Sequence, residues 1–82
     1  MKKMFLAGAN FFDTAEIYGM GECEKAMGRA LKELMEELKI ERKDFVLSTK
    51  LFKCAQGGIG VNDGGMSRKH IIEGMRNSLK RL

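Results

Sequence analysis

The sequence of 82 residues predicts an α/β fold with two parallel strands and two amphipathic helices, and three observations lead to this prediction. Two short segments, 10–15 and 45–52, are rich in residue types typical of buried strands. Residues 22–38 between them carry apolar side chains at intervals of three and four, the pattern of an amphipathic helix. A second helical pattern follows residue 67. This order predicts a β-α-β-α unit, in which the strands run parallel through a right-handed connection.

The N-terminal half begins with the end of a helix. Residues 4–7, MFLA, precede Gly8, and glycine commonly closes a helix. The next segment, NFFDTA, is expected to form the first strand, and it begins like a buried one with Phe11 and Phe12 side by side. The long helix is then expected over 22–38. Its buried stripe is expected to consist of Met27, Ala30, Leu31, Leu34, Met35 and Leu38.

The C-terminal half contains the second strand, a long loop and a final helix. The segment FVLSTKLF at 45–52 is expected to form the second strand. The glycine-rich loop that follows, about 53–66, is longer than most connections. We interpret it as a flexible loop that borders the substrate pocket, and the alternative is a plain connection without a role. We expect Ser67 to cap the final helix. The inward face of this helix is expected to contain Ile71, Met75, Leu79 and Leu82.

Two strands and two helices do not make a complete parallel sheet. Parallel strands are usually covered on both faces, and each strand here would keep an unpaired edge. The sequence also starts within one expected helix and stops at the end of another. We therefore interpret the chain as a piece of a larger α/β domain, or as a chain that other chains complete.

Composition and charge exclude several classes of protein. The longest apolar run is far short of the roughly 18 residues of a membrane-spanning helix, and the N-terminal apolar run is too short for a signal peptide. A cytoplasmic chain without direct membrane insertion is the expectation. The net charge is +4, and we interpret the basic residues near the C-terminal end as a solvated helix face rather than a nucleic-acid surface. These residues are Arg68, Lys69, Arg76, Lys80 and Arg81.

The two cysteines do not indicate a metal or redox site. Cys23 and Cys54 are 31 positions apart, and the chain has no second pair that would form a zinc site or a CxxC motif. We expect both to be buried or half-buried free thiols.

Three polar residues are candidates for chemistry. Asp13 ends the first expected strand, Tyr18 lies in the loop after it, and Lys50 ends the second strand. In parallel α/β barrels the chemistry lies at the C-terminal ends of the strands, so we expect the three side chains to converge there. An ammonium near a phenol favours the phenolate, and a carboxylate keeps the ammonium charged. Such a set would let Tyr18 exchange a proton near neutral pH.

Three segments of the sequence resemble one known family and a branch of it. The segments GANFFDTAEIYGMGECEKAMGRAL at 8–31 and FVLSTK at 45–50 resemble the second and third βα units of the aldo-keto reductases. The tail GMSRKHIIEGMRNSLKRL at 65–82 is similar to the third helix of the branch that contains voltage-gated potassium channel beta subunits. Altogether the resemblance covers about residues 5–82. It implies that residues 1–82 are the N-terminal part of a reductase domain, a partial (β/α)8 TIM barrel.

The resemblance also implies an activity and its residues. Aldo-keto reductases usually interconvert carbonyls and alcohols with NADPH, so the implied substrate is a small aldehyde or ketone. The family's catalytic Asp, Tyr and Lys match Asp13, Tyr18 and Lys50, and Asp13 would also contact the nicotinamide riboside of NADP. The fourth catalytic residue, a His or an Asn, would follow the next strand, so the 82 residues alone are expected to be inactive. His70 does not match it and is expected to be a packing or hydrogen-bonding residue.

The resemblance leaves two functions open. The first is carbonyl reduction, and the second is a regulatory beta subunit that binds a potassium channel alpha subunit and uses NADP(H) as a redox sensor. The branch commonly has a tryptophan and two glycines after the lysine strand, at its substrate site. Here the corresponding segment reads LFKCAQGG, and the chain contains no tryptophan.

Overall fold

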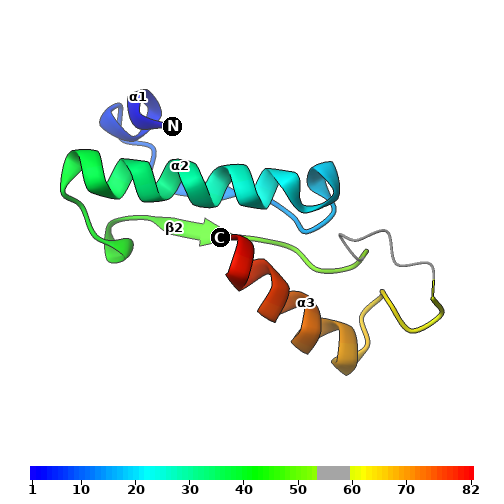
Figure 1. Ribbon diagram of the computed structural model, residues 1–82. Coiled ribbons are helices and arrows are strands. Elements are labelled where there is room, and N and C mark those ends of the chain that lie inside the picture. The colour runs from blue at the N-terminus through cyan, green and yellow to red at the C-terminus, as the bar shows by residue number, and fades with distance from the viewer. Residues whose placement is uncertain (54–59) are drawn as a thin grey trace.

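The computed structural model describes residues 1–53 and 60–82, and its element order is the predicted one. Helix α1 precedes strand β1, helix α2 connects β1 to β2, and helix α3 ends the chain (Figure 1). Short 3-10 turns lie at Tyr18–Gly21 and Arg42–Asp44. The bounds are α1 Lys2–Leu6, β1 Phe11–Asp13, α2 Glu22–Leu38, β2 Val46–Ser48 and α3 Arg68–Arg81. Within the described residues, no helix combines the length and apolarity needed to cross a membrane.

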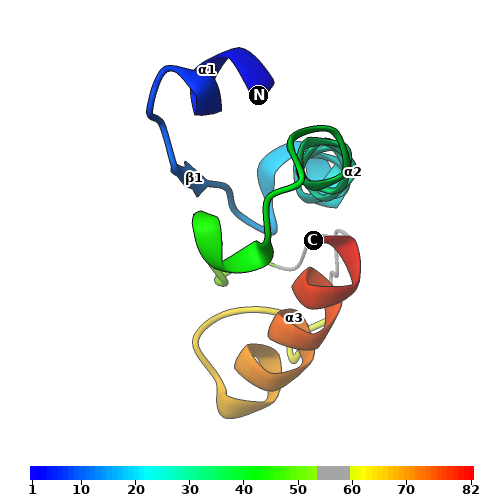
Figure 2. The ribbon, with the colours of Figure 1, turned by 90° about the vertical axis from the view of Figure 1, so that its left-hand side faces the viewer.

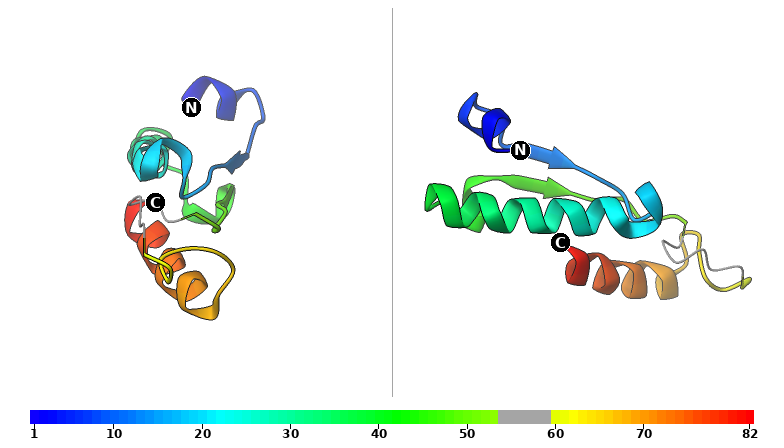
Figure 3. Two further views of the ribbon diagram at one scale, coloured as in Figure 1. Left: turned by 90° about the vertical axis from the view of Figure 1, so that its right-hand side faces the viewer. Right: turned by 45° about the horizontal axis from the view of Figure 1, so that its top comes forward.

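The two strands form a parallel pair, as predicted. Phe12 is in register with Leu47, and Asp13 is in register with Ser48. Both strands point the same way, and α2 runs along one face of the pair (Figure 3). The strands are shorter than the apolar segments that predicted them, with three residues each.

The core lies between the strand pair and α2. Phe12 from β1, Leu31 and Leu34 from α2, and Phe45 just before β2 are each less than a tenth exposed. The rings of Phe12 and Phe45 meet edge to face, with centroids 6.2 Å apart. Each fully buried side chain of this size contributes about 1.5–3 kcal/mol to folding. This cluster confirms the stripe predicted for α2, in which Met27, Met35 and Leu38 are partly buried around it.

The opposite face of the strand pair is uncovered, which corrects one expectation. Phe11 is 60% exposed and its register partner Val46 is 51% exposed, so Phe11 is not a core residue. Successive side chains of a strand point to opposite faces, and within residues 1–53 and 60–82 it is the face of Phe12 that has a helix against it. Figure 2 looks along α2 and shows α1 above this helix and α3 below it.

Helix α3 begins as predicted but buries a different face. The Ser67 hydroxyl accepts a hydrogen bond from the backbone N–H of His70, which confirms the cap. The predicted inward residues Ile71, Met75 and Leu79 are 41–69% exposed. The buried residues of α3 are His70, Gly74 and Ser78. Their spacing of four places them on one face, and this face packs against polar groups that the next section describes.

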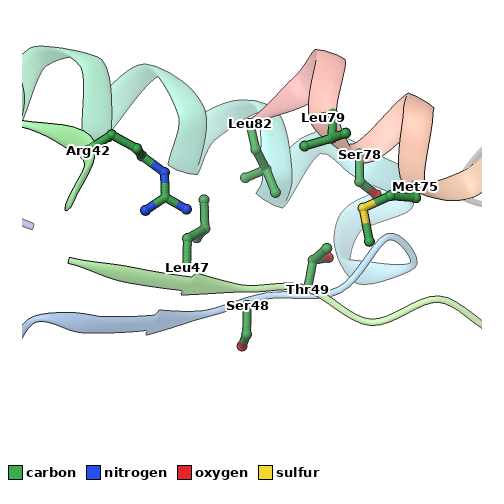
Figure 4. A pocket seen from close by; sticks show the side chains of 8 residues that line it. All are labelled: Arg42, Leu47, Ser48, Thr49, Met75, Ser78, Leu79 and Leu82. Carbon is green, nitrogen blue, oxygen red and sulfur yellow. The ribbon is translucent and has the colours of Figure 1, made fainter.

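A cavity of about 360 Å³ separates α3 from β2. Met75, Leu79 and Leu82 reach into it from the α3 side, and Leu47 and Thr49 face them from the strand and its end (Figure 4). Three of the four apolar residues predicted as the inward face of α3, Met75, Leu79 and Leu82, therefore line this cavity instead of a packed core, and the fourth, Ile71, does not line it.

Candidate active site

The candidate site lies where the two strands end. Asp13 is the last residue of β1, Ser48 is the last residue of β2, and the two are register partners. Because the strands are parallel, the loops that follow them leave from the same end of the strand pair, at the C-terminal ends of both strands. The backbone ladder continues into these loops, where the N–H of Glu16 donates to the carbonyl of Lys50 at 3.1 Å.

Asp13 and Lys50 form the centre of the site. The Nζ of Lys50 donates to Oδ2 of Asp13 at 2.5 Å and to the carbonyl oxygen of Thr14 at 2.5 Å. The Ser48 hydroxyl donates to the other oxygen of Asp13, Oδ1. Both carboxylate oxygens are therefore held by groups at the end of β2.

This pairing sets the charge of both groups. The hydrogen bond from Lys50, with that from Ser48, lowers the pKa of Asp13. The same contact with Asp13 raises the pKa of Lys50, although desolvation acts against it. Both groups are therefore charged at neutral pH, with about half of each side chain exposed.

Tyr18 lies beside Lys50, so the three side chains come together at the strand ends as expected. The Nζ of Lys50 lies 5.1 Å from the centroid of the Tyr18 ring, within the range of a cation–π contact. Tyr18 starts the 3-10 turn that precedes α2, and this turn uses positive φ at Gly19, Met20 and Gly21. Left-handed backbone is cheap for glycine, so the two glycines let the chain turn sharply after Tyr18 and enter α2.

A pocket of about 350 Å³ opens beside Tyr18 and Lys50. Its volume is within the range of small-molecule sites. Apolar and charged side chains share its lining. The lining residues are Ala15, Glu16, Ile17, Tyr18, Lys50, Phe52 and Lys53.

Glu16, which sequence analysis did not identify, ties the two loops to α3. Its side chain is 2% exposed, and Oε1 accepts the backbone N–H of Phe52 at 2.7 Å. The Nε2 of His70 lies 2.8 Å from the same oxygen, so this nitrogen is the donor. The prediction that His70 is a packing or hydrogen-bonding residue is confirmed.

The comparison with known proteins agrees with this geometry. The model of the Aldo/keto reductase family matches residues 1–82. The chain belongs to the aldo/keto reductase family. The resemblance that its motifs indicated is thereby confirmed, and the parallel β-α-β-α arrangement is a partial α/β unit of that family.

Curated relatives of this chain include proteins from plants and yeast. A protein of Oryza sativa subsp. japonica named "Probable voltage-gated potassium channel subunit beta" is 57% identical over 76 residues, 93% of this chain. An Arabidopsis thaliana protein of the same name is 53% identical over 75 residues, 92% of the chain. A Schizosaccharomyces pombe relative, also named as a potassium channel subunit beta, is 49% identical over all 82 residues. The chain spans only about a fifth of the length of these relatives.

A second buried carboxylate lies next to the segment that carries Lys50. Glu24 in the first turn of α2 is 0% exposed, and it accepts from the Thr49 hydroxyl at 2.6 Å and from Nε of Arg81 at 2.6 Å. Burial raises the pKa of Glu24, but hydrogen bonds from Thr49, Arg81 and Ser78 together outweigh it, so the net pKa is lowered. The ion pair of Glu24 with Arg81 joins α2 to the end of α3. The contact of Glu24 with Thr49 lies next to Lys50 in the sequence.

Glu24 explains two corrections. Arg81 is only 12% exposed, so it does not belong to the solvated basic face. Cys23 is exposed rather than buried, because Glu24 lies seven residues before Leu31 and takes the inward position of the first turn. Cys54 and the glycines at 57 and 58 lie outside the described residues.

The sequence held a weak signal for both glutamates. Glu16 lies between buried Ala15 and half-buried Ile17, and Glu24 continues the apolar stripe of α2. A carboxylate at such a position indicates a cationic or donor partner. The partners, His70 and Arg81, follow 54 and 57 positions later, and nothing local in the sequence connects them.

Proposed function

We propose that residues 1–82 are the N-terminal part of an aldo/keto reductase domain, and that the complete domain reduces small aldehydes and ketones to alcohols with NADPH. In this proposal β1 and β2 are neighbouring strands of an eight-stranded (β/α) barrel. The observation that carries it is the convergence of Asp13, Tyr18 and Lys50 on one edge of a parallel strand pair. Active sites of such barrels lie at this edge.

The proposed chemistry divides among the three side chains. The Tyr18 hydroxyl donates its proton to the carbonyl oxygen of the substrate. The Lys50 ammonium, next to the ring, stabilises the negative charge that develops on the phenol oxygen. Asp13 holds Lys50 in place and keeps it charged through their 2.5 Å contact. The carbonyl carbon receives a hydride, which NADPH supplies when bound.

The residues of the site fit a nicotinamide riboside. Asp13 is half exposed beside the pocket, and its carboxylate has about four lone-pair sites, of which Lys50 and Ser48 use two. No other described residue hydrogen-bonds to this carboxylate, so its remaining sites can accept a ribose hydroxyl. We therefore propose Asp13 as both a catalytic and a cofactor-binding residue. We also propose that the full-length protein works in the cytoplasm.

Replacement of Tyr18 tests the proposed function. In the full-length protein, Tyr18→Phe should lose at least about a hundredfold in kcat, the usual contribution of a general acid, while NADPH affinity measured by fluorescence stays within error. Met20→Leu, at an exposed position of the same turn, is the matched control and should keep full activity. Unchanged carbonyl turnover in Tyr18→Phe would disprove the assignment. The 82 residues alone should show no turnover, since they correspond to only about a fifth of each relative.

The names of the relatives favour a second candidate function. Each is named as a voltage-gated potassium channel subunit beta. In this alternative the full-length protein binds a channel alpha subunit, and bound NADP(H) reports the redox state of the cell. Co-purification of the full-length protein with the cytoplasmic part of a channel, together with negligible reductase activity, would favour the alternative. Brisk turnover without association would exclude it.

A further inference from the structure

The charges around the pocket beside Tyr18 do not balance. Apart from the phenol of Tyr18, the lining has three ionisable groups, and two of them already have partners: Lys50 is paired with Asp13, and Glu16 is buried against His70. The third is Lys53, which is exposed at the pocket. Lys53 has no hydrogen bond or ion pair within residues 1–53 and 60–82. The uncompensated charge of the pocket, counted over the described residues, is therefore positive.

The carboxylate of Glu16 cannot neutralise Lys53. Both contacts of its Oε1, with the N–H of Phe52 and with Nε2 of His70, hold it in the interior on the α3 side. Phe52, whose backbone is fixed by this contact, presents a side chain that is 59% exposed at the pocket. The lining of the pocket thus combines the phenol of Tyr18, the apolar side chain of Phe52 and the ammonium of Lys53.

We propose that Lys53 makes this pocket selective for carbonyl substrates that carry an anionic group, above all an aromatic aldehyde with a carboxylate. The inference rests on the proposed function, because the carbonyl is assigned to Tyr18. The anionic group contacts Lys53, and the apolar body of the substrate lies against Phe52. A volume of about 350 Å³ accommodates a single-ring substrate of this kind. A phosphate of the cofactor is the other anion that Lys53 would attract, and the experiment separates the two sources.

The experiment compares two probes that differ in charge. The full-length protein is assayed with para-carboxybenzaldehyde and with its neutral methyl ester, and the measured quantity is the ratio of their kcat/KM values. The variants are Lys53→Met, which removes the charge, and Lys53→Arg, which keeps it. The control is Lys43→Met, which removes another exposed lysine, one that pairs with Glu41 and lies at the opposite end of β2, away from the pocket.

The acid should be preferred over the ester, and Lys53→Met should lower the acid-to-ester ratio about fivefold, the size of an exposed ion pair. Lys53→Arg and Lys43→Met should keep the ratio, and added salt should lower it in the parent protein by screening. An unchanged ratio in Lys53→Met would overturn the proposal. So would a loss confined to NADPH affinity, since Lys53 would then serve the cofactor phosphate.

A binding measurement keeps this test independent of turnover. If the protein reduces neither probe, calorimetry measures the affinities of the acid and the ester, and their ratio replaces the ratio of kcat/KM values. Absent turnover with a Lys53-dependent preference for the acid would reject the reductase assignment and support the anionic selectivity. Equal affinities would reject the selectivity whatever the turnover.

Discussion

The Nε2 of His70 lies 2.8 Å from Oε1 of Glu16, and both side chains are almost completely buried. This contact joins the first turn of α3 to the loop after β1. The same carboxylate holds the backbone of Phe52, two residues beyond Lys50. The side chains that position the candidate site are therefore connected to the C-terminal helix.

Two replacements of His70 should separate the contribution of its hydrogen bond to stability from the contribution of its packing. His70→Leu leaves the buried Glu16 carboxyl with the backbone N–H of Phe52 but without its side-chain partner, and should lower the free energy of unfolding by about 3 kcal/mol. His70→Gln places an amide N–H near the position of Nε2 and should recover much of the loss. Urea unfolding of the full-length protein measures both. Equal losses in the two variants would show that the imidazole acts through packing alone.

Gly28 in α2 should behave against the usual rule for helices. A Cβ there would lie 2.3 Å from the backbone carbonyl oxygen of Arg81, at the end of α3. Gly→Ala inside a helix normally gains about 1 kcal/mol. Here Gly28→Ala should cost about 1–3 kcal/mol, as overpacking does. Arg29→Ala, at the exposed neighbouring position, is the control for the urea measurement and should be nearly neutral.

A stabilised Gly28→Ala variant would contradict the close approach of α2 and α3. The same close approach is what lets Arg81 reach Glu24. A gain in stability would therefore also weaken the account of that ion pair.

Glu24 should make stability depend on acid pH. Its pKa is lowered in the folded chain, so the unfolded chain binds more protons between that value and the ordinary glutamate pKa of about 4.3. The stabilisation is complete above the ordinary pKa and is lost as the pH falls through the folded one. Glu24→Gln should be less stable at neutral pH but should lose less stability on acidification. Urea unfolding at a series of pH values compares the two slopes, and parallel curves would show that Glu24 is not a source of the acid sensitivity.

The helices and strand order were predictable because their signals are local. The three-and-four spacing of Leu31 and Leu34 located α2, and Ser67 located the start of α3. The convergence of Asp13 and Lys50 was also predictable, since it follows from two adjacent parallel strands. In each case a rule about neighbouring residues or strand ends was sufficient.

The buried face of α3 was not predictable in the same way. Hydrophobicity favoured Ile71, Met75 and Leu79, but the structure buries His70, Gly74 and Ser78. His70 and Ser78 fit because Glu16 and Glu24, distant in sequence, hydrogen-bond to them from the facing elements. Gly74 fits because a larger residue would press on Leu51 and Glu16. Tertiary pairing of this kind leaves no periodic pattern in the sequence.

The account depends most on Tyr18 and Lys50 acting as one unit. The most direct measurement is a double-mutant cycle on the full-length protein, with kcat for carbonyl reduction determined for Tyr18→Phe, Lys50→Met and the double variant, and with Lys25→Met as the exposed-lysine control. Because Lys50 acts only through the phenol, the double variant should be about as slow as Tyr18→Phe alone. Two losses that multiply in the double variant would show that the residues act independently and would contradict the proposed proton donor.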